Sequence, residues 1–411
     1  MDAAANRTAE RLARESYGRL VALLAARTRD VAGAEDALAE AFASALKSWP
    51  RDGVPANPDG WLLTVARRRQ TDLMRRRQTR SQGEMHLQLM SEEMEEAASH
   101  PDAIPDRRLA LMFACAHPDM ERAMRAPLIL QTILGMTATD IASAFLIPPA
   151  TMGQRLVRAK ARIRDAAIPF AIPEREDLPE RLDAVLEAIY AAYAKGWTEI
   201  GDTSAERMAD EALWLGRLVV SLLPDEPEAK GMLALMLYAE ARRAARRDSG
   251  GAYVPLDQQD LALWDEAQII LAESLLRDAN QAGPTGRYQI EAAIQSAHID
   301  RRVSGRDNWP AVVALYDVLL KLTNSPVVLL NRAMALAETE GPEAALESLD
   351  TIADDKRMAQ YQPWWAARGH LAARAGDKAQ AHQALTLAIG LTSEEAVRQY
   401  LLDQRHRLQD G

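Results

Sequence analysis

The sequence predicts an all-α protein with two small helical domains followed by a long helical-repeat region, and three observations favour this class. Ala, Leu, Glu, Arg and Gln dominate the 411 residues, and all five rank among the better helix formers. Runs of alternating β-branched residues are absent, so no strand pattern competes with the helical one. Aromatic residues make up only 5 % of the chain, whereas strands are enriched in them.

The composition is that of an ordinary globular protein, with 48 % hydrophobic and 26 % charged residues. Cys115 is the one cysteine, so the chain can form no internal disulfide, which suits a reducing compartment. No apolar run approaches the ~18 residues of a membrane span. The N-terminus lacks the apolar centre of a secretory signal. We therefore expect a cytoplasmic protein with no membrane contact.

The charges are unevenly distributed along the chain. Residues 1–170 contain 24 Lys and Arg against 21 Asp and Glu, whereas the remainder contains 25 against 38. Residues 67–80 hold seven arginines and a single acid, and residues 81–103 hold six acids and no Lys or Arg. Such asymmetry indicates a part that faces nucleic acid, joined to something else.

The expected elements follow in order. About four helices occupy residues 5–80, a polar acidic linker occupies 81–103, and three or four helices occupy 105–166. The segment 168–180 has three prolines in thirteen residues, which marks a boundary. A long all-helical region follows it.

This last region has weak internal similarity. The segments 308–326, 331–352 and 364–392 place small residues where helices must approach closely, and Gly341 and Gly376 interrupt the pairs. They resemble tetratricopeptide helix hairpins, whose period is ~34 residues. The alternative is a helical bundle without repeats.

Residues 137–164 have the pattern of two helices joined by a tight turn. Thr137 is followed three residues later by Asp140, which is a capping pattern that opens a short helix. Residues 146–149 end that helix, and Pro149 is tolerated in the first turn of the next one.

The second of these helices, 149–164, has a buried face and a basic face. The buried stripe has the spacing i, i+4, i+7 and i+11 and consists of Met152, Leu156, Ala159 and Ile163. The sixteen residues carry five positive charges and no negative one. This pattern predicts a helix-turn-helix whose second helix enters a DNA major groove. The alternative is a solvated basic face on an ordinary bundle helix.

A second basic helix, 61–77, lies nearer the N-terminus. Its expected core face consists of Trp61, Leu62, Val65 and Leu73, which leaves six arginines for solvent or phosphate. A loop rich in Gly, Pro and Asn precedes it at 51–60. Before the loop, residues 30–49 form an amphipathic helix with Glu35, Asp36 and Glu40 on its polar side.

These three segments, AEDALAEAFASALKSW (34–49), WLLTVARRRQTDLMRRR (61–77) and MTATDIASAFLIPPATMGQRLVRAKARIR (136–164), resemble the extracytoplasmic-function class of bacterial RNA polymerase sigma factors over about residues 10–166. Segments 240–251, 261–268 and 286–299 are similar to the tetratricopeptide-like extension of one subgroup.

The resemblance implies a domain plan and a set of contact residues. Sigma domain 2 would occupy 1–80, sigma domain 4 would occupy 104–167, and the extension would occupy 181–411. Core polymerase would be bound by Glu35, Asp36 and Glu40. The −10 promoter element would be captured and opened by Asn57, Trp61, Arg67, Arg68, Arg69, Arg75 and Arg76. The −35 element would be read by Thr151, Gln154, Arg155, Arg158, Lys160 and Arg162.

Four positions depart from the family pattern. Ala39 replaces a usual glutamine in the docking helix, and Arg68 replaces a common asparagine. Leu146 takes the turn position usually given to glycine, so the turn must avoid positive φ or absorb strain. Gly153 lies inside the recognition helix and costs roughly 1 kcal/mol of helix propensity.

The sequence contains no phosphate-binding loop, no paired metal-ligand motif and no nucleophile motif. We therefore expect a protein that is no enzyme and needs no cofactor or metal. The expected partners are core RNA polymerase, promoter DNA and a regulatory protein at the C-terminal helices. The alternative function is a one-component helix-turn-helix regulator with a helical-repeat sensor domain.

Overall fold

The computed structural model describes a few scattered positions before residue 31 and then residues 31–55, 57–78, 104, 106–165, 172–198 and 203–410. All secondary-structure elements of these described residues are helices, apart from one isolated antiparallel bridge between Arg247 and Tyr253. The all-α prediction is confirmed. The expected acidic linker, 81–103, lies outside the described residues.

The chain divides into two compact units, Met1–Leu218 and Val219–Gly411. The boundary between the two units lies beyond the proline-rich segment 168–180, so helix α10 (Leu178–Thr198) and most of α11 (Thr203–Leu222) belong to the first unit. A proline cluster marks a break between helices, but it does not decide against which neighbours the next helix packs.

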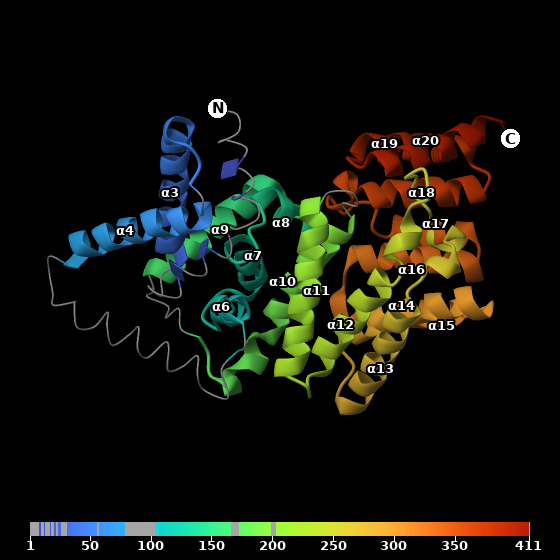
Figure 1. Cartoon of the computed structure of the whole chain (residues 1–411). Coiled ribbons are helices and arrows are strands. Elements are labelled where there is room, and N and C mark those ends of the chain that lie inside the picture. The colour runs from blue at the N-terminus through green and yellow to red at the C-terminus, as the bar shows by residue number, and fades with distance from the viewer. Residues whose placement is uncertain are drawn as a thin grey trace. The chain divides into compact units, whose positions relative to one another are not determined.

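The first unit begins with a helix pair, α3 (Val31–Asp52) and α4 (Pro58–Gln78), shown in blue in Figure 1. The chain reverses between them at Gly53, whose φ of +86° favours glycine. The rings of Trp49 and Trp61 meet edge to face, with centroids 5.4 Å apart, and Leu62 is fully buried.

The rest of the first unit is built from α6 (Arg107–Cys115), α7 (Arg122–Thr132), α8 (Ala138–Ala144), α9 (Pro149–Asp165), α10 and α11. Asp106 caps α6 by accepting hydrogen bonds from the backbone N–H groups of Arg108 and Leu109. Helix α10 packs against α6, α7 and α8. Gly196 permits the close approach of α10 and α11, because a Cβ there would collide with the Ala205 carbonyl.

Apart from the Arg247–Tyr253 bridge, the described elements of the second unit are helices. They are α12 (Pro227–Glu240), α13 (Glu266–Ala282), α14 (Arg287–Ser304), α15 (Trp309–Thr323), α16 (Pro326–Thr339), α17 (Pro342–Asp350), α18 (Gln362–Arg374), α19 (Lys378–Leu391) and α20 (Glu395–Asp410), with short 3₁₀ turns between some of them. Consecutive helices from α14 to α20 pack on one another. Gly341 and Gly376 have φ of +95° and +84° at breaks between paired helices, where the sequence predicted them. Gly369 lets α18 approach Leu385 of α19, since its Cβ would lie 2.8 Å from Leu385 Cγ.

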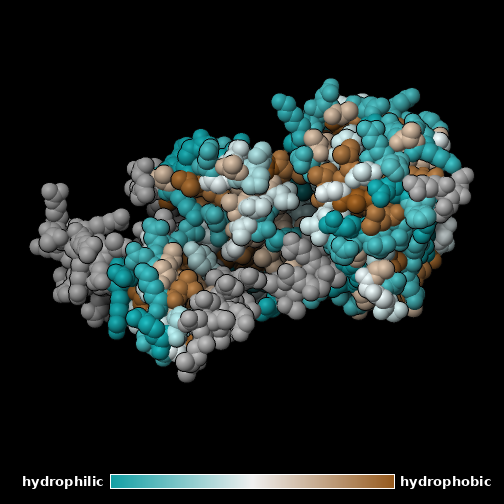
Figure 2. All heavy atoms as spheres, turned by 90° about the horizontal axis from the view of Figure 1, so that it is seen from above, coloured by the Kyte–Doolittle hydropathy of each residue, from teal (hydrophilic) through white to brown (hydrophobic). Residues whose placement is uncertain are grey.

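Hydrophilic side chains cover most of the visible described surface, with small hydrophobic areas between them (Figure 2). In the part of the chain that the structure describes, no helix is both long and apolar enough to cross a membrane.

Candidate nucleic-acid interface

Helix α8 begins with the predicted capping box. The Thr137 hydroxyl oxygen accepts a hydrogen bond from the Asp140 N–H at 3.2 Å, and Asp140 Oδ2 accepts one from the Thr137 N–H at 3.2 Å. These reciprocal bonds satisfy two donors that the helix start would otherwise leave open. The start of α8 is therefore fixed at Thr137.

The turn between α8 and α9 absorbs backbone strain at Leu146, whose φ is +51°. Leucine rarely adopts this left-handed conformation, and such residues cost of order 1–3 kcal/mol. The Leu146 N–H bonds to the Ser143 carbonyl at 3.3 Å and the Ile147 N–H bonds to the Ala142 carbonyl at 2.9 Å. Of the two outcomes expected for Leu146, the structure therefore shows a turn that absorbs strain and not one that avoids positive φ.

Helix α9 has the predicted buried stripe. Met152, Leu156 and Ala159 are at most 6 % exposed, and Ile163 is half-buried. Gln154, Arg155, Arg158 and Arg162 are exposed, and Thr151 is half-buried. The basic side chains therefore lie on a different face from the core stripe.

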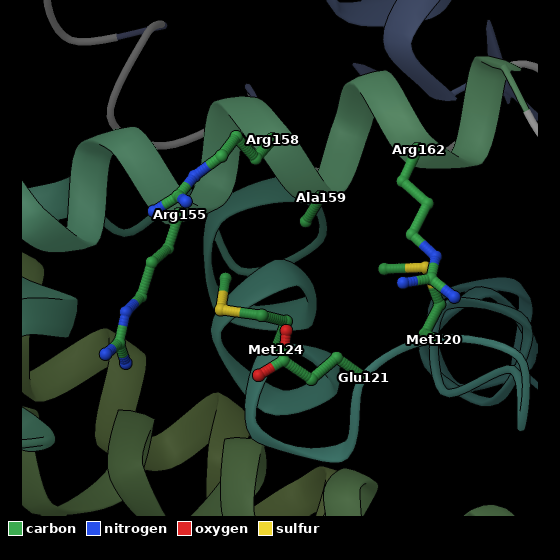
Figure 3. A pocket seen from close by; sticks show the side chains of 7 residues that line it. All are labelled: Met120, Glu121, Met124, Arg155, Arg158, Ala159 and Arg162. Carbon is green, nitrogen blue, oxygen red and sulfur yellow. The ribbon is translucent and has the colours of Figure 1, made fainter.

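Three of these arginines line a groove of about 350 Å³ together with Ala159 of α9 and residues at the start of α7 (Figure 3): Met120, Glu121 and Met124. Arg155 and Arg162 extend from α9 at the two ends of the group, with Glu121 and Met124 between them. Among the described residues, no carboxylate forms an ion pair with Arg155, Arg158 or Arg162. Unneutralised guanidinium groups on one helix face suit phosphate oxygens, to which arginine can donate two parallel hydrogen bonds.

Lys160, also predicted to contact DNA, is engaged within the protein. Its ammonium group forms an ion pair with Glu35 of α3. Glu35 is only 9 % exposed, so it does not lie on the polar face of α3 where the sequence placed it. The physical reason is that this carboxylate faces α9 and finds its counter-charge there.

The other two acids predicted to bind polymerase are exposed. Asp36 and Glu40 lie on the outer side of α3, as does Ala39, one of the departures from the family pattern. Glu40 Oε2 is 3.3 Å from Arg69 Nε, in a pair whose side chains are both more than half exposed. Such a pair is weak, so Glu40 remains available for another partner.

The predicted −10 residues have mixed environments. Arg67, Arg68 and Arg69 are exposed, and Trp61 is half-buried against Trp49. Asn57 Oδ1 accepts a hydrogen bond from the Gly60 N–H at 3.0 Å, so Asn57 stabilises the start of α4. Arg75 and Arg76 belong to α4, but their side chains lie outside the described part of the structure.

Cys115, at the end of α6, is buried. Burial, reinforced by the negative charge of Glu35, raises the pKa of its thiol well above the usual range. Within the described residues, no group of three His, Cys, Asp or Glu side chains could hold a metal ion.

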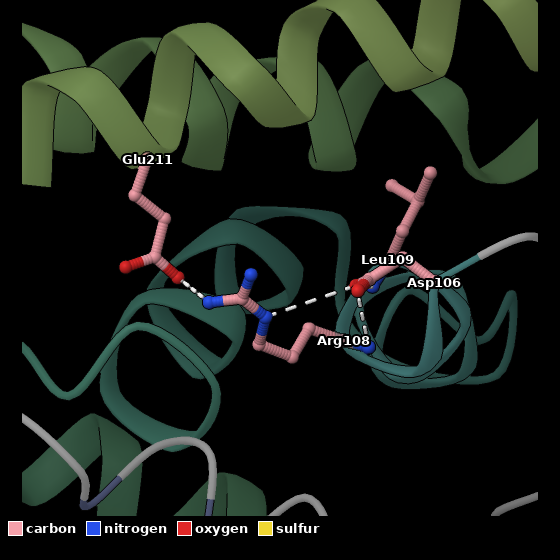
Figure 4. Close-up of polar contacts among 4 residues, drawn as sticks. All are labelled: Asp106, Arg108, Leu109 and Glu211. Carbon is pink, nitrogen blue, oxygen red and sulfur yellow. Dashed lines mark hydrogen bonds and ion pairs between the residues drawn. The ribbon is translucent and has the colours of Figure 1, made fainter.

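Sequence reasoning missed the residues that join α10 and α11 to this site. Lys195 of α10 lies 2.8 Å from Asp140, and buried Arg181 donates to the Phe113 carbonyl at 3.2 Å. Arg108 of α6 pairs with Glu211 of α11 (Figure 4). These contacts link residues far apart in the chain, and no local pattern indicates them.

Comparison with known proteins defines the family. Residues 12–80 match the family described as Sigma-70 region 2, and residues 181–280 match a family of unknown function (DUF6596). An uncharacterized protein of Rhizobium meliloti (strain 1021) is 37 % identical over 382 residues, which cover 91 % of this chain and 90 % of that relative. No solved structure matches.

The chain therefore belongs to the sigma-70 family and carries a C-terminal extension. The region 2 match supports a sigma-factor role in transcription initiation. Factors of this family are not enzymes.

Proposed function

We propose that this protein is an extracytoplasmic-function sigma factor, which binds core RNA polymerase in the cytoplasm and directs it to promoters. The observation that carries this proposal is the Sigma-70 region 2 match over residues 12–80. A one-component regulator would have no need of that region. The exposed acids of α3, Asp36 and Glu40, then bind polymerase. Helix α4 and the loop before it bind the −10 element through the arginines at 67–69.

In this proposal α8, the Leu146 turn and α9 form a helix-turn-helix that binds the −35 element. The support is an exposed basic face, with Gln154 near the N-terminal end and Arg155, Arg158 and Arg162 along the groove. Side chains near the start of such a helix reach base edges, and the arginines reach phosphates. The tetratricopeptide-like extension regulates the factor and offers a surface to a partner protein.

Run-off transcription with purified core polymerase on a promoter library tests the proposal. The wild-type protein should direct initiation at a subset of promoters with a shared −35 and −10 sequence. Replacing Asp36→Lys and Glu40→Lys together should abolish co-purification with core polymerase. Asp183→Lys, at an exposed acid of α10, is the matched control and should still co-purify. Retained polymerase binding by the α3 variant would favour the one-component regulator.

The DNA contacts have a separate test. Arg155→Ala or Arg158→Ala should weaken binding to the −35 duplex. If the arginine contacts a base, the loss should be about 1–3 kcal/mol and the specificity at that position should relax. If it contacts a phosphate, binding to all sequences should weaken equally. Arg122→Ala, at an arginine of α7 whose side chain is 81 % exposed, is the control and should bind normally. Unchanged binding by both α9 variants would remove this face from the DNA interface.

A further inference from the structure

Helix α10 contacts the bundle of α6 to α9 at two widely separated points. Near its start, Arg181 is 7 % exposed and donates from Nη1 to the Phe113 carbonyl of α6. Near its end, Lys195 Nζ lies 2.8 Å from Asp140 Oδ1 of α8. At 1.5 Å per residue these points are about 21 Å apart along the helix. Between them Val185 and Ile189 are fully buried, so α10 is packed along its length.

Asp140 serves two structural roles with its two carboxylate oxygens. Oδ2 accepts hydrogen bonds from the Thr137 N–H at 3.2 Å and the Thr137 hydroxyl at 2.6 Å, within the capping box. Oδ1 accepts one from Lys195 at 2.8 Å. The side chains are only 27 % and 21 % exposed, so the pair is sheltered from solvent. Burial acts to raise the pKa of Asp140, but the hydrogen bonds from Lys195 and Thr137 and the Lys195 charge outweigh it and lower the pKa.

Helix α8 depends on such outside contacts because it is short. It has seven residues, and isolated helices below ~12 residues are marginal in water. It also leads directly into the strained turn at Leu146, and a strained residue persists only when its surroundings over-determine it. We therefore expect that a less ordered start of α8 would change the conformation of the turn and, with it, the position of the basic face of α9.

Helix α11 holds the cap of α6 in a similar way. Arg108 pairs with Glu211 of α11, and its Nε lies 3.8 Å from Oδ1 of Asp106, the residue that caps α6 (Figure 4). The Arg108 guanidinium also lies 5.3 Å from the ring centre of Trp214. The start of α8 is thus linked to α10 through its capping acid, Asp140. The start of α6 is linked to α11 through Arg108, which lies beside the capping acid Asp106.

We infer that α10 and the first part of α11 are a brace that belongs to the DNA-reading unit, and that Lys195 is a positioning residue that holds Asp140 and so sets α8 and α9. This inference rests on the proposed role of α9 in binding duplex DNA. It also assigns a structural role to the first residues of the matched region of unknown function, 181–280, because these residues complete the domain that precedes them.

The test uses the full-length protein and a duplex selected by the wild type from a pool of random duplexes. Lys195→Met keeps the aliphatic stem but removes the charge, and it should weaken duplex binding about five- to tenfold, as expected for a loss of preorganisation. Lys195→Arg should bind within about twofold of the wild type, since it keeps a positive charge opposite Asp140. Arg122→Met is the matched control. It breaks the 2.7 Å pair between α7 and Asp183 of α10, whose side chains are 81 % and 72 % exposed, and should have little effect.

Amide hydrogen exchange supplies a readout that does not depend on DNA. In Lys195→Met, the amides of residues 141–147 should exchange faster, while those of α6 and α7 stay protected. Arg122→Met should exchange like the wild type. Unchanged exchange and binding in Lys195→Met would overturn the inference, and so would failure of Lys195→Arg to restore either. Faster exchange throughout α6 to α10 would also overturn it, by showing a general stability effect. A wild type that selects no duplex would sink the proposed DNA role, while the exchange data would still decide whether the brace exists.

Discussion

Glu35 of α3 and Lys160 of α9 form an ion pair whose side chains are only 11 % and 25 % exposed. The pair joins the helix proposed to bind polymerase to the helix proposed to bind the −35 element. Each of the two residues already has a partner inside the protein. The exposed residues Asp36 and Glu40 on one helix, and Arg155 and Arg158 on the other, are therefore better placed for external contacts.

Replacing Lys160→Met should destabilise the first unit by about 1–3 kcal/mol, because it leaves the buried Glu35 carboxylate without its counter-charge. The double variant Glu35→Gln with Lys160→Met should recover part of this loss. Urea unfolding followed by tryptophan fluorescence measures both. Glu40→Gln is the control, since it breaks only the exposed pair with Arg69, and it should change stability by less than about 1 kcal/mol. Equal losses of stability in Lys160→Met and Glu40→Gln would show that the buried pair stabilises the fold no more than the exposed one.

His298 should make the second unit sensitive to acid. Burial, reinforced by the charges of Arg301 and Arg242, lowers the pKa of His298 from 6.5 to about 4. The folded pKa of His298 lies below the unfolded one, so the folded state favours the neutral imidazole. The free energy of unfolding is therefore unaffected by His298 above about pH 6.5 and decreases as the pH falls to about 4. His298→Gln should therefore show a flatter stability profile in this window, by up to about 3 kcal/mol. The control is His382→Gln, at an exposed histidine, which should keep the wild-type profile. If His298→Gln also gave the wild-type profile, the prediction would be contradicted.

Gly153→Ala should stabilise α9. A Cβ at this position would meet no atom within 4 Å, so alanine adds helix propensity worth about 1 kcal/mol without a clash. Slower hydrogen exchange of the α9 amides would report the gain. Duplex binding by the same variant then distinguishes two reasons for the glycine: reduced binding in spite of a firmer helix would mean that DNA approaches the backbone here, and normal binding would mean that the glycine is only a weak point in the helix.

Truncation should give different results at the two possible boundaries. A fragment that ends at residue 170 lacks α10 and exposes the surfaces of α6, α7 and α8 that pack against it. The amides of α6 to α9 should therefore lose protection in this fragment, and its transcription should fall. A fragment that ends at residue 218 keeps the whole first unit and should retain protection. Transcription by the longer fragment then tests the regulatory role of the second unit directly. Equal protection in both fragments would show that α10 is dispensable for folding.

Local patterns in the sequence predicted local structure well. The capping box at Thr137 and Asp140, the Pro149 helix start and the buried stripe of α9 all follow from neighbouring residues, and each is present in the structure. The environments of Glu35 and Lys160 could not be predicted in this way, because their pairing joins residues 125 positions apart. The packing of α10 on α7 was missed for the same reason: an amphipathic pattern shows that a helix has a buried face, but not which helix covers it.

The single cysteine of this protein has a practical consequence for spectroscopy. Cys115 is 2 % exposed, and burial raises the pKa of its thiol, so the reactive thiolate is scarce at neutral pH and shielded from reagents. A second cysteine placed on the surface can therefore be labelled selectively while the native one is left in the core. Position 157 is suitable for the substitution Val157→Cys, since this residue of α9 is 69 % exposed and does not line the groove. A fluorophore attached there would report the arrival of a DNA duplex or of polymerase at α9 in real time.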